Sequence, residues 1–398
     1  MKIILITGLF PSETNLTKGS FNIERLEALR QLGHDVTVVV PVSYTPPLRY
    51  LFPVPNIKNI VDHISLVRNL PGYEIIGGIH VYRLKRISLP YKMFWKYDVK
   101  VLDVFNGNNI RRILNHYKAD FIITSGLNPS AVYSKYIKKY LDVPILSIFE
   151  GSDILIAPKK YRGIDAMINI INQNVDQCIF VSNSFKDDVI KEYKFDNIAV
   201  INNGYQNDIF YYDKDLNTHS INNVNIITVG HLEKIKGHDI LLEAFKTLSN
   251  DYSLTIIGDG KMMDRYKSLA LKYGIQNRVS FIGHISQLNI KRYLDNADIF
   301  CMPSRSESFG IAALEAMACG LPVIGANVGG IKELILNGFN GYFFSNGSVQ
   351  DLIEMIKKAS TTKWNHGQIA SWARENYSWE KWAMAVVENY NSKKGSLR

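Results

Sequence analysis

Cysteine is scarce in this sequence, since its 398 residues contain only three. Cys178, Cys301 and Cys319 lie far apart in apolar surroundings, at no metal-ligand spacing and in no disulfide framework. That distribution is typical of a reducing cytoplasm. No apolar run approaches the length of a membrane-spanning helix. The first residues, Met1 to Gly8, predict a strand, because a signal peptide would need a longer apolar core and a cleavage site. We therefore expect a cytoplasmic protein.

Several motifs of catalysis are also missing. The sequence has no Gly-x-x-x-x-Gly-Lys-Ser/Thr run, which argues against a P-loop ATPase, and no Gly-x-Ser-x-Gly turn of the α/β-hydrolases. His63, His80, His116 and His366 have no partners at metal-ligand spacing, and Asp213-Lys-Asp215 stands in a polar connector without further ligands. We predict no metal site and no resident cofactor.

Charge is unevenly distributed along the chain. The net charge is +9, and most of the excess lies in residues 1–205. Nucleic acid, an anionic membrane and an anionic substrate would each account for a basic first half, as would solubility alone. No recognised nucleic-acid-binding module occurs, so we expect no nucleic acid partner.

Short β-branched runs alternate with longer helical patterns over the whole chain. Several of these runs are apolar on both faces, as in buried parallel strands with crossover helices. The predicted strands are Ile3–Thr7, Asp35–Val40, His80–Leu84, Phe121–Thr124, Ile145–Phe149, Cys178–Val181, Ala199–Ile201, Ile226–Val229, Leu254–Ile257, Val279–Ile282, Ile299–Met302 and Val323–Gly325. The predicted helices are Phe21–Leu32, Ile240–Leu248, Met263–Tyr273, Ile290–Asn296, Ile311–Ala318 and Val349–Ser360. The pattern predicts an α/β protein made of two units in tandem.

The boundary between the two units falls in the polar stretch Asn202–Ser220, after which a new strand pattern starts at Asn225. We predict a first domain over 1–205 and a second over 206–377. A helix over 378–392 carries apolar residues at helical spacing and should pack back on the first domain. Tyr44–Gly78 is rich in proline and poor in periodicity, which predicts a long loop with one short helix.

The most informative stretch places two carboxylates, Glu307 and Glu315, eight residues apart around a Ser-Phe-Gly turn. Ser308 is a candidate N-cap for the predicted helix at 311–318. A helix start with unpaired amides and a positive dipole end favours phosphate. Carboxylates on either side can accept hydrogen bonds from sugar hydroxyls. The segment therefore predicts a site for a sugar joined to a phosphate.

Three further strand-to-helix turns carry candidate groups. Lys236 follows a strand in the same half as Glu307 and is a point-charge partner for phosphate. Glu150 and Asp153 follow another strand, where residues of a ligand site emerge, although Asp153 could equally cap a helix as a surface residue. Gly19 would allow a close approach to an anion, but turns of this kind are common and a structural role is the favoured interpretation.

These residues together resemble the retaining glycosyltransferases of family 4, glycosyl transferases group 1. The matching segments run in order through the second half of the chain, and the match is looser in the first half. They are Gly230-His-Leu with Lys236-Gly237, Ile257–Gly260, Ala297–Ser304, Glu307–Glu315, Glu315–Val323, Gly329–Glu333 and Asn337–Gly341, preceded by Gly19, Glu150–Asp153, Val181–Ser184 and Asn203-Gly204.

The resemblance implies a GT-B fold, in which two Rossmann-like domains face each other across a cleft, and a retaining, metal-independent transferase of the hexosyltransferase type. It implies catalytic roles for Glu307, Glu150 and Lys236, with Asp153 on the acceptor side. The donor, a nucleotide-sugar with UDP as its expected nucleotide, would be bound by Gly19, His231, Lys236, His284, Ile285, Ser308, Phe309, Gly310, Ile311 and Glu315. Glu307 would hold the donor sugar, Glu315 the ribose, and the amides of residues 309–311 the diphosphate.

Two residues depart from the family pattern. His231 stands where the family usually carries arginine, and a histidine contact depends on pH. Glu150 stands where the family often has histidine; facing the donor sugar, it could accept hydroxyl hydrogen bonds or stabilise an oxocarbenium charge.

A basic segment with aromatic residues, 83–118, predicts binding to an anionic membrane, with a glycan or lipid-linked molecule as acceptor. Its basic residues are Arg83, Lys85, Arg86, Lys92, Lys96, Lys100, Arg111, Arg112 and Lys118, interleaved with Tyr91, Phe94, Trp95 and Tyr97. Each basic group near such a surface adds about 1 kcal/mol. The upstream loop Leu48–Pro55 could add apolar contact. The protein would then lie on the inner face of the plasma membrane, although an amphipathic helix with core aromatics and solvated lysines gives the same pattern.

The function predicted is sugar transfer to a polysaccharide or lipid-linked acceptor in cell-envelope glycan synthesis. A nucleotide-sugar epimerase or a phosphorylase on the same fold remains an alternative, as does a sugar-binding protein with a decayed site. The paired Glu307 and Glu315 favour transfer.

Overall fold

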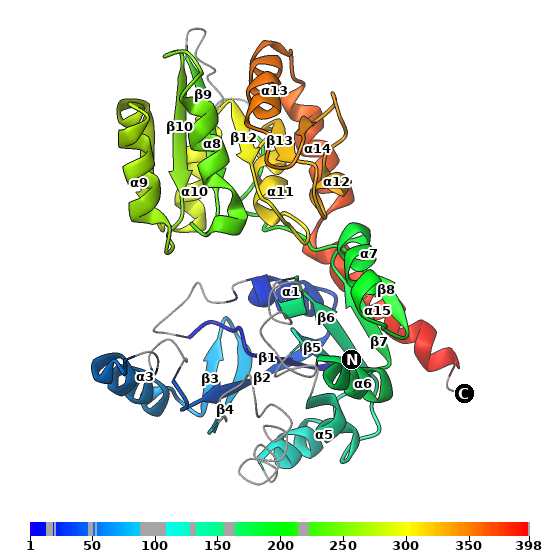
Figure 1. Ribbon diagram of the computed structural model, residues 1–398. Coiled ribbons are helices and arrows are strands. Elements are labelled where there is room, and N and C mark those ends of the chain that lie inside the picture. The colour runs from blue at the N-terminus through cyan, green and yellow to red at the C-terminus, as the bar shows by residue number, and fades with distance from the viewer. Residues whose placement is uncertain are drawn as a thin grey trace. The chain divides into compact units, whose positions relative to one another are not determined.

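The computed structural model describes residues 1–12, 19, 21–46, 51, 54–87, 109–127, 133–151, 153–154, 164–213 and 223–396. The chain forms two compact α/β units. The first contains Met1–Val181, Lys186–Ile201 and Glu380–Arg398, and the second contains Ser182–Phe185 and Asn202–Trp379. Each unit has a sheet with helices around it (Figure 1).

The first unit is built on an eight-stranded sheet of order β3-β4-β2-β1-β5-β6-β7-β8. Its strands are parallel except for the pair β3 and β4. They are β1 (Lys2–Thr7), β2 (Asp35–Ser43), β3 (Tyr73–Ile76), β4 (Ile79–Arg86), β5 (Phe121–Ser125), β6 (Ile145–Phe149), β7 (Gln177–Phe180) and β8 (Ile198–Val200). The strands β5, β6 and β7 are buried at every position, and their sequences are mostly apolar, as expected of strands covered on both faces.

Helices connect the strands of this sheet. They are α1 (Phe21–Gln31), α3 (Ile57–Asn69), α5 (Ser134–Lys138), α6 (Ile164–Asn174) and α7 (Asn183–Glu192). The last helix, α15 (Trp379–Ser396), also belongs to this unit from Glu380 onward. Tyr390 of α15 stacks on Phe121 of β5 with ring centroids 4.5 Å apart, so the end of the chain is packed on the first sheet.

The second unit contains a six-stranded parallel sheet of order β11-β10-β9-β12-β13-β14. Its strands are β9 (Val224–Val229), β10 (Tyr252–Ile257), β11 (Val279–Gly283), β12 (Ile299–Met302), β13 (Val323–Ala326) and β14 (Gly341–Phe344). The helices are η4 (Lys234–Lys236), α8 (His238–Phe245), α9 (Met263–Lys272), η5 (Gln276–Arg278), α10 (Gln287–Asp295), α11 (Ile311–Ala318), α12 (Ile331–Leu334), α13 (Val349–Thr361) and α14 (His366–Asn376).

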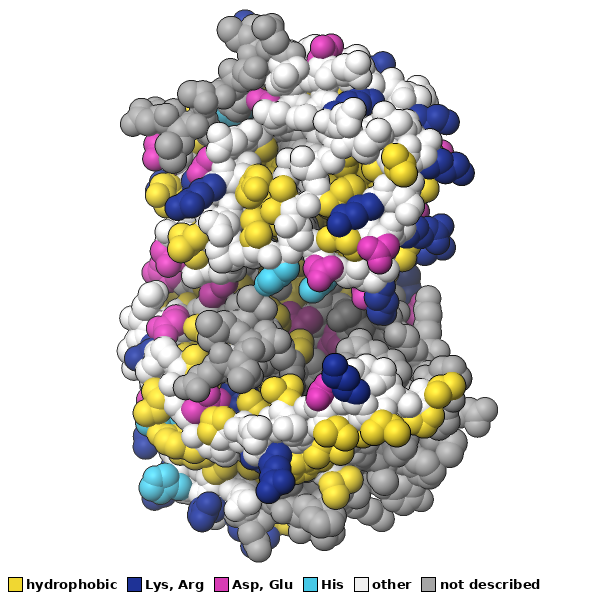
Figure 2. Space-filling model, turned by 90° about the vertical axis from the view of Figure 1, so that its left-hand side faces the viewer, with side chains coloured by type: hydrophobic (Ala, Val, Ile, Leu, Met, Phe, Trp, Pro, Cys, Tyr) yellow, Lys and Arg dark blue, Asp and Glu magenta, His cyan; other side chains and the backbone are white. Residues whose placement is uncertain are grey.

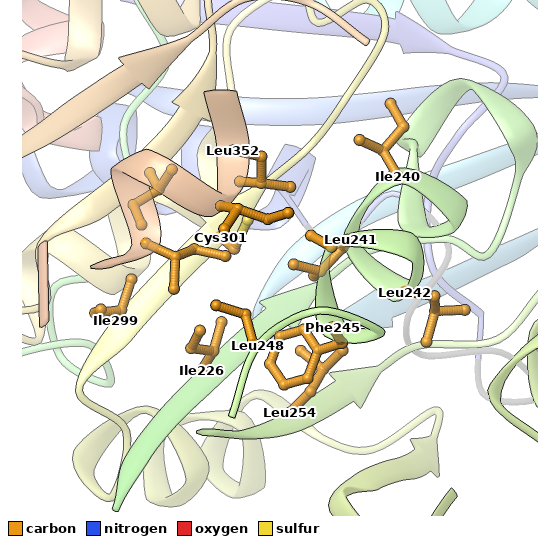
Figure 3. Close-up of a cluster of buried hydrophobic side chains, with 14 of the residues drawn as sticks. Ile226, Ile240, Leu241, Leu242, Phe245, Leu248, Leu254, Ile299, Cys301 and Leu352 are labelled. Atoms are coloured by element: carbon orange, nitrogen blue, oxygen red, sulfur yellow. The ribbon is translucent and has the colours of Figure 1, made fainter. Parts of the chain in front are cut away.

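The core of the second unit lies between the sheet and the helices that cover it (Figure 3). Leu241 and Phe245 recur at a spacing of four on α8, so they share one helix face, and both are fully buried. They pack with Ile226 of β9 and Leu254 of β10. Burying each such side chain contributes about 1.5–3 kcal/mol, which holds α8 on the sheet and fixes the loop that precedes it.

The predicted alternation of strands and helices is confirmed, and every predicted strand is present with ends shifted by a few residues. The prediction was wrong for Tyr44–Gly78, which holds a 13-residue helix, α3, and the strand β3. The strand β14 and the helix α14 were missed. Short strands such as β3 carry too few residues to show a period of two. In the part of the chain that the structure describes, no helix has the length and hydropathy needed to cross a bilayer.

Candidate active site

The loops that follow β9, β12 and β13 leave the second sheet at the same edge, because neighbouring strands in it are parallel. This is the edge at which open parallel sheets bind their ligands. Lys236 lies in the loop after β9, and Glu307 lies in the loop after β12. The sheet order, with β9 beside β12, therefore brings together two residues that are 71 positions apart in sequence.

Lys236 and Glu307 form an ion pair at the centre of this edge. Lys236 Nζ donates to Glu307 Oε2 over 2.7 Å, and the hydroxyl of Ser304 donates to the same oxygen over 3.4 Å. The Lys236 side chain is 30% exposed and that of Glu307 is 10% exposed. Glu307 Oε1 has no hydrogen-bond partner among the described residues. The pair thus presents a cation and one available carboxylate oxygen together.

Arg305 and Asp239 hold the two loops in register. The Arg305 guanidinium makes two parallel hydrogen bonds of 2.8 Å to the Asp239 carboxylate, and its Nη1 also donates to the carbonyl oxygen of Lys234 over 2.7 Å. The backbone N–H of Arg305 donates to the carbonyl oxygen of Ile235 over 2.7 Å. Partial burial alone would raise the pKa of Asp239, but Arg305 holds it below its usual value. The sequence analysis missed this pair, since nothing in a linear motif links the two residues.

The helix α11 begins at Gly310, which adopts a left-handed conformation with φ of 106°. The prediction that Ser308 caps this helix was wrong, because Gly310 is the N-cap and no side chain caps the helix. A side chain at 310 would be strained and would meet Ile331 Cδ1 at 2.5 Å. The amides of Phe309, Gly310 and Ile311 have no acceptor within the described residues. A turn with unpaired amides is thus present, with glycine in place of the serine cap, and its binding of an anion stays a prediction.

The glycine pair at 329 and 330 packs against the backbone of the turn at Glu307. A Cβ on Gly329 would lie 1.7 Å from the carbonyl oxygen of Glu307, and the Gly330 N–H donates to that same oxygen over 3.1 Å. Gly329 also has a positive φ of 46°. The backbone of this pair therefore lies against the Glu307 loop, which it fixes in place.

The other predicted donor-binding residues of this unit lie at different depths. Glu315 is half-buried on α11, Ile285 is half-buried after β11, and His231 and His284 are exposed. His238, directly after the Lys236 loop, is buried beside Tyr266. Burial, followed by the nearby charge of Lys236, lowers the pKa of His238 to about 4, so it is neutral and adds no charge to the anion site.

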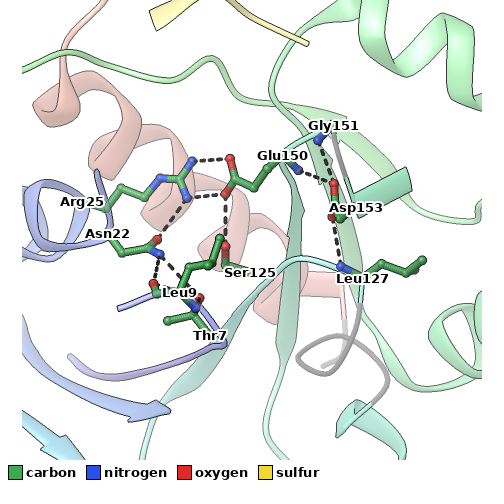
Figure 4. Close-up of polar contacts among 9 residues, drawn as sticks. All are labelled: Thr7, Leu9, Asn22, Arg25, Ser125, Leu127, Glu150, Gly151 and Asp153. Atoms are coloured by element: carbon green, nitrogen blue, oxygen red, sulfur yellow. Dashed lines mark hydrogen bonds and ion pairs between the residues drawn. The ribbon is translucent and has the colours of Figure 1, made fainter. Parts of the chain in front are cut away.

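Glu150 belongs to a polar network in the first unit (Figure 4). Arg25 of α1 donates to both of its carboxylate oxygens, over 2.5 and 3.2 Å, and the Ser125 hydroxyl donates to Oε1 over 3.1 Å. Arg25 is buried and also donates to Asn22 Oδ1, while Asn22 Nδ2 donates to the carbonyl oxygen of Leu9. Glu150 emerges from a strand end as predicted, but its charge is balanced by an arginine that the sequence analysis did not single out.

Asp153 organises the turn after β6. Its carboxylate accepts hydrogen bonds from the backbone N–H groups of Leu127, Glu150 and Gly151 over 3.0, 3.2 and 2.8 Å (Figure 4). Burial, followed by the charge of Glu150, raises the pKa of Asp153 to about 6. The residue therefore shapes the Glu150 turn.

Gly19 takes a structural position in the first unit. It has φ of 72°, and a Cβ there would lie 2.5 Å from the carbonyl oxygen of Leu9. Gly19, Glu150 and Asp153 belong to one unit, and the cluster of Lys236 with Glu307 belongs to the other. Within each unit the predicted residues do converge on strand ends.

Two basic residues of segment 83–118 do not face outward as predicted. Arg83 is buried, pairs with Glu74 and donates to the carbonyl oxygen of Pro11 over 2.5 Å. Arg86 is also buried, with its guanidinium over the Tyr133 ring. Both lie on β4 and point into the fold, so neither is available to a membrane. Residues 88–108, which include Lys92, Lys96, Lys100 and the four aromatic residues, lie outside the described residues.

Among the residues that the structure describes, no group of three or more His, Cys, Asp or Glu side chains is placed to hold a metal ion. The three cysteines are unpaired and buried.

Comparison with known proteins gives a family match for both halves of the chain. Residues 215–376 match the protein family described as Glycosyl transferases group 1, and residues 21–208 match the family described as Glycosyltransferase Family 4. The structure superposes on Anabaena HepE, solved in complex with UDP-glucose, with a TM-score of 0.72 at 18% identity over 98% of this chain and all of that one. The chain is a glycosyltransferase of the GT-B type. The predicted fold is confirmed.

Curated relatives of this glycosyltransferase span most of its length. An uncharacterized glycosyltransferase of Methanocaldococcus jannaschii is 28% identical over 347 residues, which cover 80% of this chain and 95% of the relative. The putative teichuronic acid biosynthesis glycosyltransferase TuaC of Bacillus subtilis is 26% identical over 382 residues, which cover 93% of this chain and 90% of the relative.

Proposed function

We propose that this GT-B glycosyltransferase transfers a sugar from a UDP-sugar to a polysaccharide or lipid-linked acceptor in cell-envelope glycan synthesis. Transfer would retain the anomeric configuration and need no metal ion. The observation that carries the proposal is the Lys236–Glu307 ion pair beside the unpaired amides at the start of α11. The complex of HepE with UDP-glucose supports the donor class, and the name of TuaC supports the envelope setting.

Breaking the bond between sugar and diphosphate leaves negative charge on the diphosphate. The ammonium of Lys236 and the amides of Phe309, Gly310 and Ile311 are fixed positive groups suited to stabilise that charge as it develops. They require no reorganisation, since Arg305 and Asp239 already lock the Lys236 loop to the loop after β12. In this proposal these groups do the work that a metal ion does in other transferases.

The carboxylates would position the two sugars of the donor. Glu307 Oε2 is held by Lys236 and Ser304, which orients Oε1 toward a donor-sugar hydroxyl. Glu315, which lies one helical turn after Ile311 on α11, would accept hydrogen bonds from the ribose hydroxyls. His231, His284 and Ile285 would lie near the diphosphate and base.

The first unit would supply the remaining groups. We propose that Glu150 stabilises positive charge at the donor sugar and that Asp153 and Gly19 shape the loops on the acceptor side. Support for Glu150 comes from its 18% exposed side chain, which leaves the carboxylate accessible although Arg25 holds it. The Arg25 pair would also fix the direction of the Glu150 carboxylate.

A thermal-shift screen against UDP, GDP, ADP, dTDP and their sugars tests the donor class. We expect UDP and one or more UDP-sugars to raise the melting temperature by several degrees, because a ligand at 100 times its Kd stabilises by about 2.7 kcal/mol. The Lys236→Gln variant should lose most of that shift. The matched surface variant Lys267→Gln, on α9, should keep it.

Turnover measurements complete the test. Release of UDP from the stabilising donor should continue in excess EDTA, and proton NMR of the product should show the anomeric configuration of the donor. If no nucleotide raises the melting temperature, the alternative of a sugar-binding protein with a decayed site would be favoured. Isomerisation or phosphorolysis of the donor without sugar transfer would instead favour the epimerase or the phosphorylase. Activity lost in EDTA and restored by Mg²⁺ would contradict the metal-independent part.

We also propose that the protein binds the surface of an anionic membrane through the first unit. On α3, Ile57, Val61 and Ile64 are 73%, 56% and 42% exposed, at spacings that place them along one side of the helix. Figure 2 shows hydrophobic side chains gathered on the lower part of the face it draws. Arg111 and Arg112, which the sequence analysis assigned to this surface, are exposed. Apolar insertion combined with basic residues is the composition of a peripheral membrane surface.

Sedimentation with phosphatidylglycerol vesicles at low and high salt measures this binding. The wild type should pellet with vesicles at low salt and be released in part at high salt, which screens the charges. The double variant Ile57→Ser/Val61→Ser should remain in the supernatant. Leu271→Ser, which removes an apolar side chain that is 67% exposed on the second unit, is the control and should pellet normally. Equal pelleting of the α3 variant and the wild type would exclude this helix.

A further inference from the structure

A pocket lies in the second unit, at the end of α11 opposite to its unpaired amides. Its volume is 790 Å³, within the range of about 300–1,000 Å³ typical of small-ligand sites. It is lined by the connector 205–212, by the start of α14 and by Ala318 at the last turn of α11. The unpaired amides lie at the other end of that eight-residue helix, about 12 Å away. The pocket is therefore separate from the Lys236–Glu307 site.

One face of α14 makes the floor of this pocket. Gly367, Ala370 and Ser371 line it, and their small side chains leave space above the helix. Arg374 lies on the same side of the helix, two turns after His366, and is exposed. Open space therefore lies along this face of α14, and the guanidinium of Arg374 lies at one end of it.

Aromatic rings make the walls, and one of them is held rigidly. Tyr212 stacks on His366 with ring centroids 6.3 Å apart and an interplanar angle of 18°. Gly320 gives room for this ring, since a Cβ there would lie 2.7 Å from Tyr212 Cδ2. His366 Nδ1 is 2.9 Å from the Gly320 carbonyl oxygen, which can only accept, so Nδ1 is the donor. Tyr212 and His366 therefore form a preorganised flat surface.

Tyr211 and Trp364 add two more rings to the lining. Tyr211 is 52% exposed, and the ammonium of Lys291 lies 4.6 Å from the centre of its ring. Rings with one apolar face exposed and polar groups beside them suit sugars, whose C–H faces are apolar and whose edges carry hydroxyls. Asn207, Gln368 and Ser371 supply amide and hydroxyl groups for such edges.

The charge of the lining has one sign. Lys363 and Arg374 are both exposed in it, and none of the described residues that line it is Asp or Glu. Carboxylates bind such cations by charge-assisted hydrogen bonds. A phosphate would instead favour the amides at the start of α14, one of which, the Gln368 N–H, already donates to Asn365 Oδ1 over 3.1 Å. The lining thus favours a carboxylate-bearing sugar over a nucleotide.

We infer that this pocket binds an acidic oligosaccharide, that is, a short glycan carrying uronic acid carboxylates. The sugar faces stack on Tyr212 and its neighbouring rings, and the carboxylates pair with Arg374 and Lys363. The site goes beyond the transfer reaction proposed above, and its occupancy needs no donor. In a transferase that extends an acidic polymer, it would hold a part of the glycan remote from the reacting end.

Isothermal titration with trigalacturonic acid, in the absence of nucleotide, tests the inference. We expect binding by the wild type, no binding of the neutral control maltotriose, and weakening by about 10-fold or more in Arg374→Gln. Tyr212→Ala should weaken binding as well. Lys267→Gln, which removes an exposed cation elsewhere in the unit, should bind as the wild type does.

Three outcomes would overturn the inference: no heat of binding with trigalacturonic acid, equal binding of maltotriose, or unchanged affinity in Arg374→Gln. UDP titration of the same variants separates this site from the donor site. Arg374→Gln should bind UDP as the wild type does. Because the glycan titration contains no nucleotide, its result stands even if UDP does not bind and the donor proposal fails.

Discussion

Glu307→Gln should lower the turnover of sugar transfer by about 100- to 1,000-fold, which is the range found when one fixed electrostatic group is removed from an active site. The substitution keeps the size of the side chain and removes its charge. Lys236, which donates to Glu307 Oε2 over 2.7 Å, would lose its counter-ion. Because the proposed role of Glu307 is strongest while the sugar bond breaks, donor affinity should change less than turnover.

Steady-state kinetics of UDP release, with a thermal melt of each variant, measure this effect. Glu354→Gln, an exposed glutamate on α13, is the matched control and should keep both activity and melting temperature. The double variant Lys236→Gln/Glu307→Gln should lose less than the two single losses combined, because the two residues act as a unit. A Glu307→Gln protein that folds and retains more than half of its turnover would contradict the assigned role.

Arg25→Met should lower the free energy of unfolding of the first unit by about 3–5 kcal/mol, because it leaves the Glu150 carboxylate without its partner. The pair is bidentate, and the Arg25 side chain is only 1% exposed. Its guanidinium also lies over the rings of Phe21 and Trp382, so the substitution removes ring contacts as well. Hydrogen exchange of peptides from α1 and β6, followed by mass spectrometry, reports the loss within this unit.

The same helix provides the control for this prediction. Arg30 pairs with Glu27 at 3.0 Å, but both side chains are 38% exposed. Arg30→Met should therefore change stability by no more than about 1 kcal/mol. Equal exchange rates in the Arg25→Met and Arg30→Met proteins would contradict the importance given to the buried pair.

Glu150→Gln separates the structural role of Glu150 from its proposed role in transfer. It keeps the size of the side chain and one acceptor oxygen for Arg25 and Ser125, while removing the charge and the second acceptor. A folded Glu150→Gln protein should show reduced turnover with donor affinity largely kept. Unchanged turnover would assign Glu150 to structure alone.

The turn before α11 shows how far a local motif can be followed. The bounds of the helix, Ile311–Ala318, were predicted correctly, because its apolar run and the preceding small residues are local signals. The capping residue was predicted wrongly. Serine is a preferred N-cap residue, which pointed to Ser308, but Gly310 takes the N-cap position. What decided between them is the packing of Ile331 against the turn and the close approach of the Gly329 backbone to Glu307. Both come from residues about 20 positions further along the chain.

The charged pairs show the same division. The sequence indicated Lys236 and Glu307 because each ends a strand of one parallel sheet, and such ends meet at one edge. It did not indicate Arg25 with Glu150, or Asp239 with Arg305, because those partners belong to no shared motif. Arg83 and Arg86 were misplaced for a related reason: a basic residue within a strand can face either outward or into the fold, and only the pairing of β4 with β2 and β3 decides.

The sequence by itself determined the two-unit α/β fold, the order of strands and helices along the chain, and the segments that carry the turns proposed to bind the donor, since these follow from local periodicity and glycine placement. Tertiary structure alone decided which carboxylates have cationic partners, which arginines are buried, and that Tyr212, His366 and Arg374 surround one pocket. The physical reason is that charge balance and cavities depend on distances between segments far apart in the chain, which only the packed sheets and helices fix.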